Sequence, residues 1–286
     1  MYKSKSLQDL NLIDSFLFSA STENPQDAEF IAKLIVERAT GKKIKEISVL
    51  PEKPLMGIDT KHHGIRMDLY IMEYENDSIA SVYDIEPNKY NISELPKRSR
   101  YNQAVTDVKL LSAGKTYKEL PEYISIWILT EDPFGENRML YTVRNKVEEA
   151  SGKEFKDGVT KLFLYVNGEF GGTESLKTLL TYFSQSDETN VADEELQHIH
   201  SIVENVKRNE ERREHYMTWQ EMIEFEKEES YLEGESAGIN KGRYQSIKIH
   251  ISSPREFQIS DELILQSIIE KFQIPADEAE EFMKEQ

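Results

Sequence analysis

Residues 64–89 constrain the fold more than any other stretch, because they have the pattern of two β-strands joined by a short turn. The turn at 75–78, Glu-Asn-Asp-Ser, consists of residues that favour tight turns. Side chains alternate between the two faces of a strand, so the apolar residues of the first strand fall on one face. The polar faces carry Arg66, Asp68 and Tyr70 in the first strand and Asp84, Glu86 and Asn88 in the second.

The loop of this hairpin decides whether its acidic residues lie together. Residues that lie opposite each other on paired strands point to the same face of the sheet. Asp68, Asp84 and Glu86 all have even numbers, so they share a face only if the residue numbers of each opposed pair add to an even number. A two-residue loop gives an odd number and separates the carboxylates, whereas a three-residue loop sets Asp68 opposite Asp84. We therefore predict an odd loop, or a β-bulge, between Tyr74 and Val82.

Three acids on neighbouring strands require an explanation, because a buried, unpaired charge is costly. One explanation is a hard cation, since Mg²⁺ is held by one or two carboxylates together with water and substrate phosphate. The other is a solvated face of an antiparallel sheet. Zinc is not expected, because the chain has no Cys and the pairs His62-His63 and His198/His200 have the wrong spacing to share a face.

The order of these motifs resembles the PD-(D/E)XK nuclease superfamily, in which an Asp of one strand is followed by Glu-x-Lys or Glu-x-Gln near the end of the next. Here the matching residues are Asp68 and Glu86-Pro87-Asn88. The chain is most similar to the nuclease family transposases of this superfamily, also called recombination-promoting nucleases, over roughly residues 10–243. The further motifs are Asp14-Ser15-Phe16, Arg66-x-Asp68, Asp84-Ile85-Glu86, Lys97-Arg98-Ser99-Arg100-Tyr101, Gly114, Tyr117, Asp132-Pro133-Phe134-Gly135 and Glu233-Gly234 with Gly238 and Gly242.

The resemblance implies a restriction-endonuclease-like α/β core, with a mixed sheet flanked by helices, and a C-terminal helical extension. It also implies a Mg²⁺- or Mn²⁺-dependent endonuclease that hydrolyses DNA phosphodiester bonds in transposition or recombination. Asp68 and Glu86 would hold the cation, and Asp84 would be a further ligand or a base for water. Asn88 would orient that water, because an amide does not accept a proton at neutral pH. The residues expected to bind DNA are Arg66, Lys97, Arg98 and Arg100, and those expected to support the site are Asp14 and Gln103.

Position 88 and the charge distribution favour a different interpretation. The superfamily has Lys at this position and the transposase group usually has Gln, where this chain has Asn88. Residues 1–130 hold 17 Lys and Arg against 19 Asp and Glu, so most of the net charge of −18 falls on residues 131–286. An acidic half repels nucleic acid and suits solvent or a protein partner. The alternative is therefore an inactive nuclease-fold module for binding or assembly. An antiphage or toxin nuclease is a third hypothesis that the sequence does not separate from the first.

Periodicity elsewhere predicts helices at residues 7–19, 27–39 and 93–113, and strands at 43–50, 119–130, 138–143 and 159–166. The nearly continuous apolar run within 119–130 indicates a central strand that is buried on both faces. The pattern is helical from residue 173 onward, with a loose helix or linker expected at Gly234, Gly238 and Gly242. We expect a nuclease-like core at 1–185, an acidic helical extension at 186–243 and short helices at 244–286.

Features that the sequence lacks indicate the cellular compartment and the partners of the protein. No apolar run reaches the ~18 residues that span a bilayer, and the first residues have no apolar signal segment. The absence of Cys fits a reducing compartment. We therefore expect a cytoplasmic protein with no membrane association. Its expected partners are DNA and, through the acidic helices, a second copy or another protein.

Overall fold

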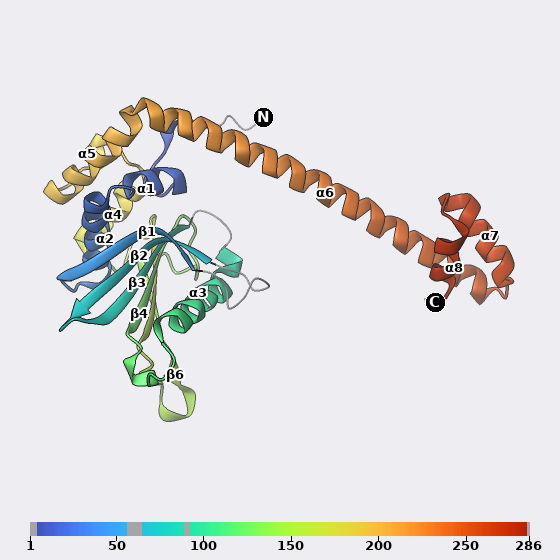
Figure 1. The fold of residues 1–286 in the computed structure, drawn as a ribbon, viewed down its shortest axis with the longest axis horizontal. Coiled ribbons are helices and arrows are strands. Elements are labelled where there is room, and N and C mark those ends of the chain that lie inside the picture. The colour runs from blue at the N-terminus through green and yellow to red at the C-terminus, as the bar shows by residue number, and fades with distance from the viewer. Residues whose placement is uncertain (1–4, 56–64, 89–91, 285–286) are drawn as a thin grey trace. The chain divides into compact units, whose positions relative to one another are not determined.

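The computed structural model describes residues 5–55, 65–88 and 92–284 of the 286-residue chain. Two compact units are present, Met1–Tyr216 and Met217–Gln286. The first contains a β-sheet and helices, whereas the second is helical (Figure 1). His62 and His63 lie outside the described residues.

A six-stranded mixed sheet in the order β1-β2-β3-β4-β8-β5 forms the centre of the first unit. Strands β1, β2 and β3 are successive antiparallel neighbours, β4 and β8 continue the sheet in parallel, and β5 pairs antiparallel with β8. The predicted mixed α/β sheet is therefore confirmed. The bounds are Glu46–Leu55 (β1), Ile65–Glu75 (β2), Ser78–Asn88 (β3), Glu122–Leu129 (β4), Leu140–Val143 (β5) and Val159–Tyr165 (β8), with a small separate hairpin of Lys146–Val147 (β6) and Lys153–Glu154 (β7).

Helices cover both faces of the sheet. Strand β4 pairs on both of its edges, and every residue after Glu122 in it is buried, which confirms the predicted central strand. Helix α3 (Leu95–Leu110) lies on one side of the sheet and packs against β1 and β4. Helices α1 (Ser15–Ser21) and α2 (Pro25–Thr40) lie on the other side, where α2 packs against β1 and β2 (Figure 1).

The N-terminal segment does not form the single helix predicted at residues 7–19. A short 3-10 helix, η1 (Leu7–Asp9), is separated from α1, and Asp14 occupies the N-cap position of α1. A polar residue that can cap a helix favours such a break. The remaining short elements of this unit are the helix α4 (Glu174–Ser184) and the 3-10 helices η2 (Ile92–Glu94), η3 (Tyr117–Glu119), η4 (Glu148–Ala150) and η5 (Glu188–Asn190).

Helix α5 (Glu194–Arg208) also belongs to the first unit, so the boundary predicted at residue 185 is misplaced. Its apolar stripe is buried, and the helix packs against α1 and α2. Further along the chain, Tyr216 stacks on Phe16 of α1, with ring centroids 4.8 Å apart. The acidic composition of this segment reflects its outer face and does not describe the stripe that it buries.

The second unit contains the later turns of α6 (Glu210–Glu256), together with α7 (Asp261–Phe272) and α8 (Ala276–Lys284). Ile247 and Ile251 of α6 pack on Ile264 and Ile268 of α7 in a small core. The two short C-terminal helices are thus as predicted, but the loose linker is not. Helix α6 continues through all three glycines, which have open space where a side chain would be. None of the helices within the described residues has the length and apolarity needed to cross a membrane.

Candidate metal-binding site

The β2–β3 hairpin contains the predicted irregularity. Asn76 and Asp77 form a two-residue turn with positive φ angles of 50° and 61°. Glu75 pairs with Ser78, but the register then shifts, because Ala80 is an extra residue of β3. Beyond this bulge, the residue numbers of each opposed pair add to an even number. The bulge prediction is therefore confirmed.

The register differs in one respect from the three-residue-loop alternative. Tyr70, not Asp68, lies opposite Asp84. One step further along the same register, Asp68 lies opposite Glu86, and Asp84 is its diagonal neighbour. All three carboxylates consequently project from the face of the sheet that α3 covers.

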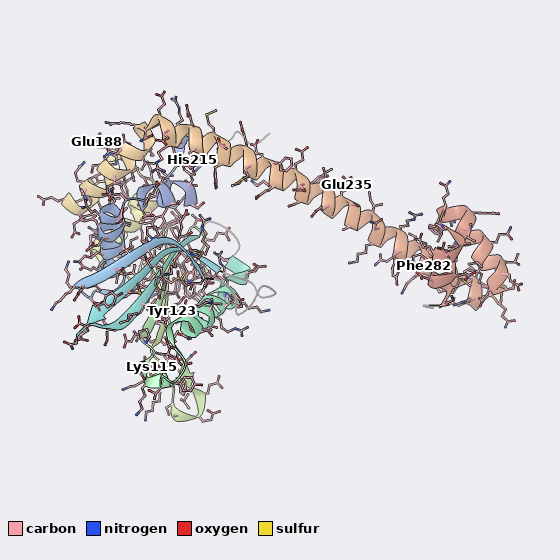
Figure 2. The ribbon with its side chains drawn as sticks, in the orientation of Figure 1. Lys115, Tyr123, Glu188, His215, Glu235 and Phe282 are labelled. Atoms are coloured by element: carbon pink, nitrogen blue, oxygen red, sulfur yellow. The ribbon has the colours of Figure 1, made fainter. Side chains whose placement is uncertain are left out.

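Asp84 is fully buried at the centre of this face. Its Oδ2 accepts a hydrogen bond of 3.0 Å from the Tyr123 hydroxyl of β4 and one of 3.4 Å from Nδ2 of Asn102 in α3. Its Oδ1 is buried and has no hydrogen-bond partner within the described residues. Burial raises the pKa of Asp84 to about 6, although its interactions with Tyr123, Asn102 and the neighbouring Glu86 side chain act in the opposite direction. Figure 2 labels Tyr123 on its strand.

Glu86 is 2% exposed and is held by one cation. Its Oε2 accepts a hydrogen bond of 3.2 Å from Nη2 of Arg98 on α3. Its Oε1 is buried without a hydrogen-bond partner in the part of the chain that the structure describes. Burial, followed by the charges of Asp84 and Asp68, raises the pKa of Glu86 well above its ordinary value. One half-exposed guanidinium therefore does not compensate this group of carboxylates.

Asp68 completes the group and is partly buried. Burial and the charge of Asp84 raise the pKa of Asp68 to about 6, while Arg98 and Arg66 lower it. The neighbouring carboxylate of Glu52 acts in the same direction as Asp84. Asp68, Asp84 and Glu86 thus form one coupled set of acids that share a face of the sheet.

Unsatisfied polar atoms gather at this place. Six buried side-chain atoms lack a hydrogen-bond partner among the described residues, and four of them belong to Asp84, Glu86, Ser125 and Trp127. Asp84 pairs with Ser125 and Glu86 pairs with Trp127 across the parallel β3–β4 ladder, so these four residues are immediate neighbours. Buried polar atoms are normally hydrogen-bonded, so such a concentration indicates that groups other than the described residues complete the site.

A hard divalent cation fits this donor set. Mg²⁺ and Mn²⁺ prefer carboxylate oxygens, and Mg²⁺ uses only one or two from the protein, with water and substrate as the other ligands. No group of three or more His, Asp or Glu side chains converges tightly enough to enclose a metal ion among the described residues. The arrangement therefore suits an open site of one or two protein carboxylates, and not a closed cage.

Several residues expected near the carboxylates have other roles. Gln103 Nε2 lies 3.4 Å from Oδ2 of Asp107 on its own helix, and Asn102, one position earlier, is the residue that reaches the site. Asp14 accepts a hydrogen bond of 2.8 Å from the Asn11 backbone N–H and lies 3.8 Å from Lys5. These contacts belong to the start of α1, so a structural role replaces the predicted supporting role of Asp14.

The predicted DNA-binding cations lie at or near α3. Lys97 and Arg100 are exposed on α3, and Arg98 is the cation that reaches Glu86. Arg66 is exposed on β2 and forms an ion pair of 2.7 Å with Glu52. Asn88 pairs with Leu129 through its position in β3, but its side chain lies outside the described residues, so its predicted role is not tested.

Sequence reasoning missed four residues of the site: Asn102, Tyr123, Trp127 and Glu52. Tyr123 and Trp127 belong to an apolar run in which nothing marks them as polar partners. Their position depends on the register of the parallel β3–β4 pair, which a sequence does not specify by itself. Asn102 carried a usable signal, because it is a polar residue on the inner face of a helix whose first turns are basic.

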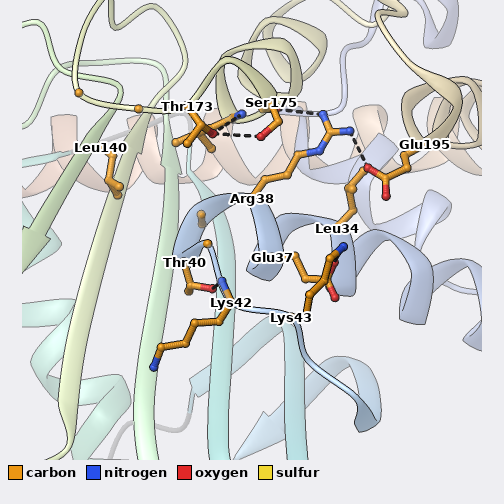
Figure 3. A pocket seen from close by; sticks show the side chains of 15 residues that line it. Leu34, Glu37, Arg38, Thr40, Lys42, Lys43, Leu140, Thr173, Ser175 and Glu195 are labelled. Atoms are coloured by element: carbon orange, nitrogen blue, oxygen red, sulfur yellow. Dashed lines mark hydrogen bonds and ion pairs between the residues drawn. The ribbon is translucent and has the colours of Figure 1, made fainter.

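A cavity of about 580 Å³ lies elsewhere in the first unit, between the C-terminal end of α2 and the N-terminal end of α4 (Figure 3). Its charged side chains largely neutralise one another: Arg38 binds Glu195, and Lys43 binds Glu37. It contains none of the three hairpin carboxylates. This cavity is therefore not part of the candidate metal-binding site.

No protein family matches this chain, and comparisons with curated proteins and with solved structures found no significant match.

Proposed function

We propose that the first unit is a restriction-endonuclease-like core and that the protein is a Mg²⁺- or Mn²⁺-dependent DNA endonuclease of the transposase-associated type. The observation that carries the proposal is a pair of buried carboxylate oxygens, Asp84 Oδ1 and Glu86 Oε1, beside Asp68 on one face of the hairpin. Neither oxygen has a hydrogen-bond partner in the described part of the chain. The motif resemblance supplies the reaction class, and the geometry supplies a place for the cation.

In this proposal Asp68 and Glu86 would hold the cation, and Asp84 beside them would be the base for water. When bound, such a cation lowers the pKa of a water molecule and stabilises negative charge on a phosphate. The Tyr123 hydroxyl and Asn102 fix the orientation of Asp84, so its free oxygen faces the site.

The substrate is bound from the side of α3 in this proposal. Lys97, Arg98 and Arg100 bring three positive charges to the first turns of this helix. Lys161 of β8 donates a hydrogen bond of 3.3 Å to Ser99 from the same side of the sheet. Cations that surround a metal site suit the backbone phosphates of a nucleic acid.

A plasmid-nicking assay with purified protein and Mg²⁺ or Mn²⁺ tests this proposal. We expect Asp68→Asn to reduce nicking by at least about 10²-fold, because a principal cation ligand is lost. The matched control is Asp77→Asn, which changes an exposed Asp in the turn of the same hairpin. Equal nicking by the parent protein and Asp68→Asn would overturn the assignment.

A second candidate function is a nuclease-fold module that binds or assembles without cleaving. Asn88 at the position of the superfamily Lys favours it, and so does the finding that no three His, Asp or Glu side chains of the described residues converge on a metal position. Under the nuclease proposal, Asn88→Lys raises nicking, because an ammonium stabilises developing charge better than an amide. Under the alternative, neither the parent protein nor Asn88→Lys nicks DNA above the Asp68→Asn background.

A further inference from the structure

Arg98 has two anchors of different chemistry. Its Nη2 donates to Glu86 at 3.2 Å, and its guanidinium carbon lies 5.3 Å from the centre of the Trp127 ring. The side chain is half exposed, and a guanidinium has five N–H donors, so it has further donors to offer a ligand. Arg98 therefore combines one charged anchor at the carboxylates with one aromatic anchor in the sheet.

A divalent cation would compete for only the first anchor. Glu86 is one of the two expected principal ligands, and a carboxylate that binds a doubly charged ion holds a guanidinium less strongly. The Trp127 ring is fully buried in β4 and continues to attract the guanidinium face when Glu86 is engaged. Arg98 would thus lose its ion pair and still stay at the mouth of the site.

We propose that Arg98 is a replaceable counter-ion of Glu86. It neutralises Glu86 in the metal-free protein, releases Glu86 when the divalent ion binds, and then binds a phosphate group of the DNA backbone. The planar guanidinium suits this second role, because it donates paired hydrogen bonds to phosphate oxygens. This inference rests on the proposed function and identifies Arg98, among the cations of α3, as the one that alternates between protein and substrate.

Titration of the DNA-free protein with Mn²⁺ tests the first half of the inference without measuring activity. Arg98→Ala should bind Mn²⁺ about three- to tenfold more tightly than the parent protein, because a competing, partly exposed ion pair is removed. Arg98→Lys should fall between them. Arg100→Ala is the matched control: it removes the same charge from the same helix, and its affinity for Mn²⁺ should stay within about twofold of the parent.

Binding of a short DNA duplex in Ca²⁺ tests the second half. Arg98→Ala should weaken DNA binding about three- to tenfold although its metal affinity has risen, and Arg98→Lys should recover part of the loss.

Unchanged or weaker Mn²⁺ binding by Arg98→Ala overturns the inference if Glu86→Gln still weakens Mn²⁺ binding, because the metal site itself then remains supported. Tighter Mn²⁺ binding with unchanged DNA binding overturns the phosphate role. Mn²⁺ binding that is insensitive to Glu86→Gln overturns both the inference and the proposed function.

Discussion

The first unit contains two groups of buried charge that differ in how they are compensated. Arg38 of α2 is 8% exposed, and its Nη1 and Nη2 atoms make four hydrogen bonds, two of them to the carboxylates of Asp193 and Glu195. Among the described residues, the hairpin carboxylates form one ion pair, with the half-exposed guanidinium of Arg98, and two of their buried oxygens have no hydrogen-bond partner. The charge of Arg38 is therefore compensated by two carboxylates, although its Nε has no hydrogen-bond partner among the described residues. The hairpin carboxylates are left undercompensated by the part of the chain that the structure describes.

This difference separates a structural cluster from a functional one. Burying a charge costs free energy unless hydrogen bonds or opposite charges compensate it. Undercompensated buried charges therefore occur mainly at functional sites. The Arg38 cluster joins α2, α4 and the start of α5, and so connects segments that are far apart in sequence. The hairpin acids contact β4 and α3, yet two of their buried oxygens have no hydrogen-bond partner among the described residues. We expect the two groups to respond in opposite ways to mutation.

Truncation should have the largest effect. A 1–185 fragment loses α5 together with Asp193 and Glu195, which leaves the buried Arg38 without its anionic partners. We expect this fragment to lack cooperative unfolding, whereas a 1–216 fragment retains it, because its buried stripe is complete. Urea denaturation followed by circular dichroism distinguishes them. A cooperative transition of 1–185 equal to that of 1–216 would show that α5 is not part of the core.

Substitution within the two groups should have effects of opposite sign. Arg38→Met should destabilise the protein by about 3 kcal/mol, because it removes four hydrogen bonds and leaves two acids unpaired. Glu86→Gln should stabilise the metal-free protein, or leave it unchanged, because it removes an undercompensated buried charge. Both free energies of unfolding follow from urea denaturation with a chelator present. Equal destabilisation by the two substitutions would remove the distinction between the clusters.

The pH dependence of stability should come from the hairpin group. Burial raises the pKa of Asp68 and Asp84 to about 6, above the ordinary value of 3.8, so the folded protein binds more protons than the unfolded chain between these values. The stability from this pair is therefore fully present below pH ~4 and is lost as pH rises through ~6. Without metal, the parent protein should lose on the order of 2 kcal/mol between about pH 5 and 7 relative to Asp68→Asn/Asp84→Asn. Parallel stability curves for the two proteins would contradict the raised pKa values.

The smallest effect should come from the two amides of α3. Asn102→Ala removes a hydrogen bond to Asp84 and should cost about 1 kcal/mol, with a further rise in the pKa of Asp84. Gln103→Ala, at the next position, should have little effect, because its contact is with the partly exposed Asp107. Thermal unfolding of both variants makes this comparison. A larger loss from Gln103→Ala would indicate that Gln103, and not Asn102, supports the site.

The sequence predicts the parts of this site that depend on local rules. Period-two alternation placed Asp84 and Glu86 on one face, and the parity of opposed residues required the bulge that Ala80 supplies. The contributions of Tyr123 and Trp127 depend on parallel strand pairing between distant segments, which alternation does not determine. The domain boundary failed for a related reason: the polar segment at 184–190 marks a break, but the apolar stripe of α5 does not specify that it packs on α1 and α2.

Calorimetric titration with Mn²⁺ tests the central claim most directly, namely that the unpartnered hairpin carboxylates bind a divalent cation. The variant Asp68→Asn/Glu86→Gln keeps the side-chain shapes and removes two charges, and Glu75→Gln/Asp77→Asn is a matched control in the exposed turn of the same hairpin. We predict saturable binding by the parent protein and the control, and no binding at this site by the Asp68/Glu86 variant. Identical Mn²⁺ binding by all three proteins would contradict the account.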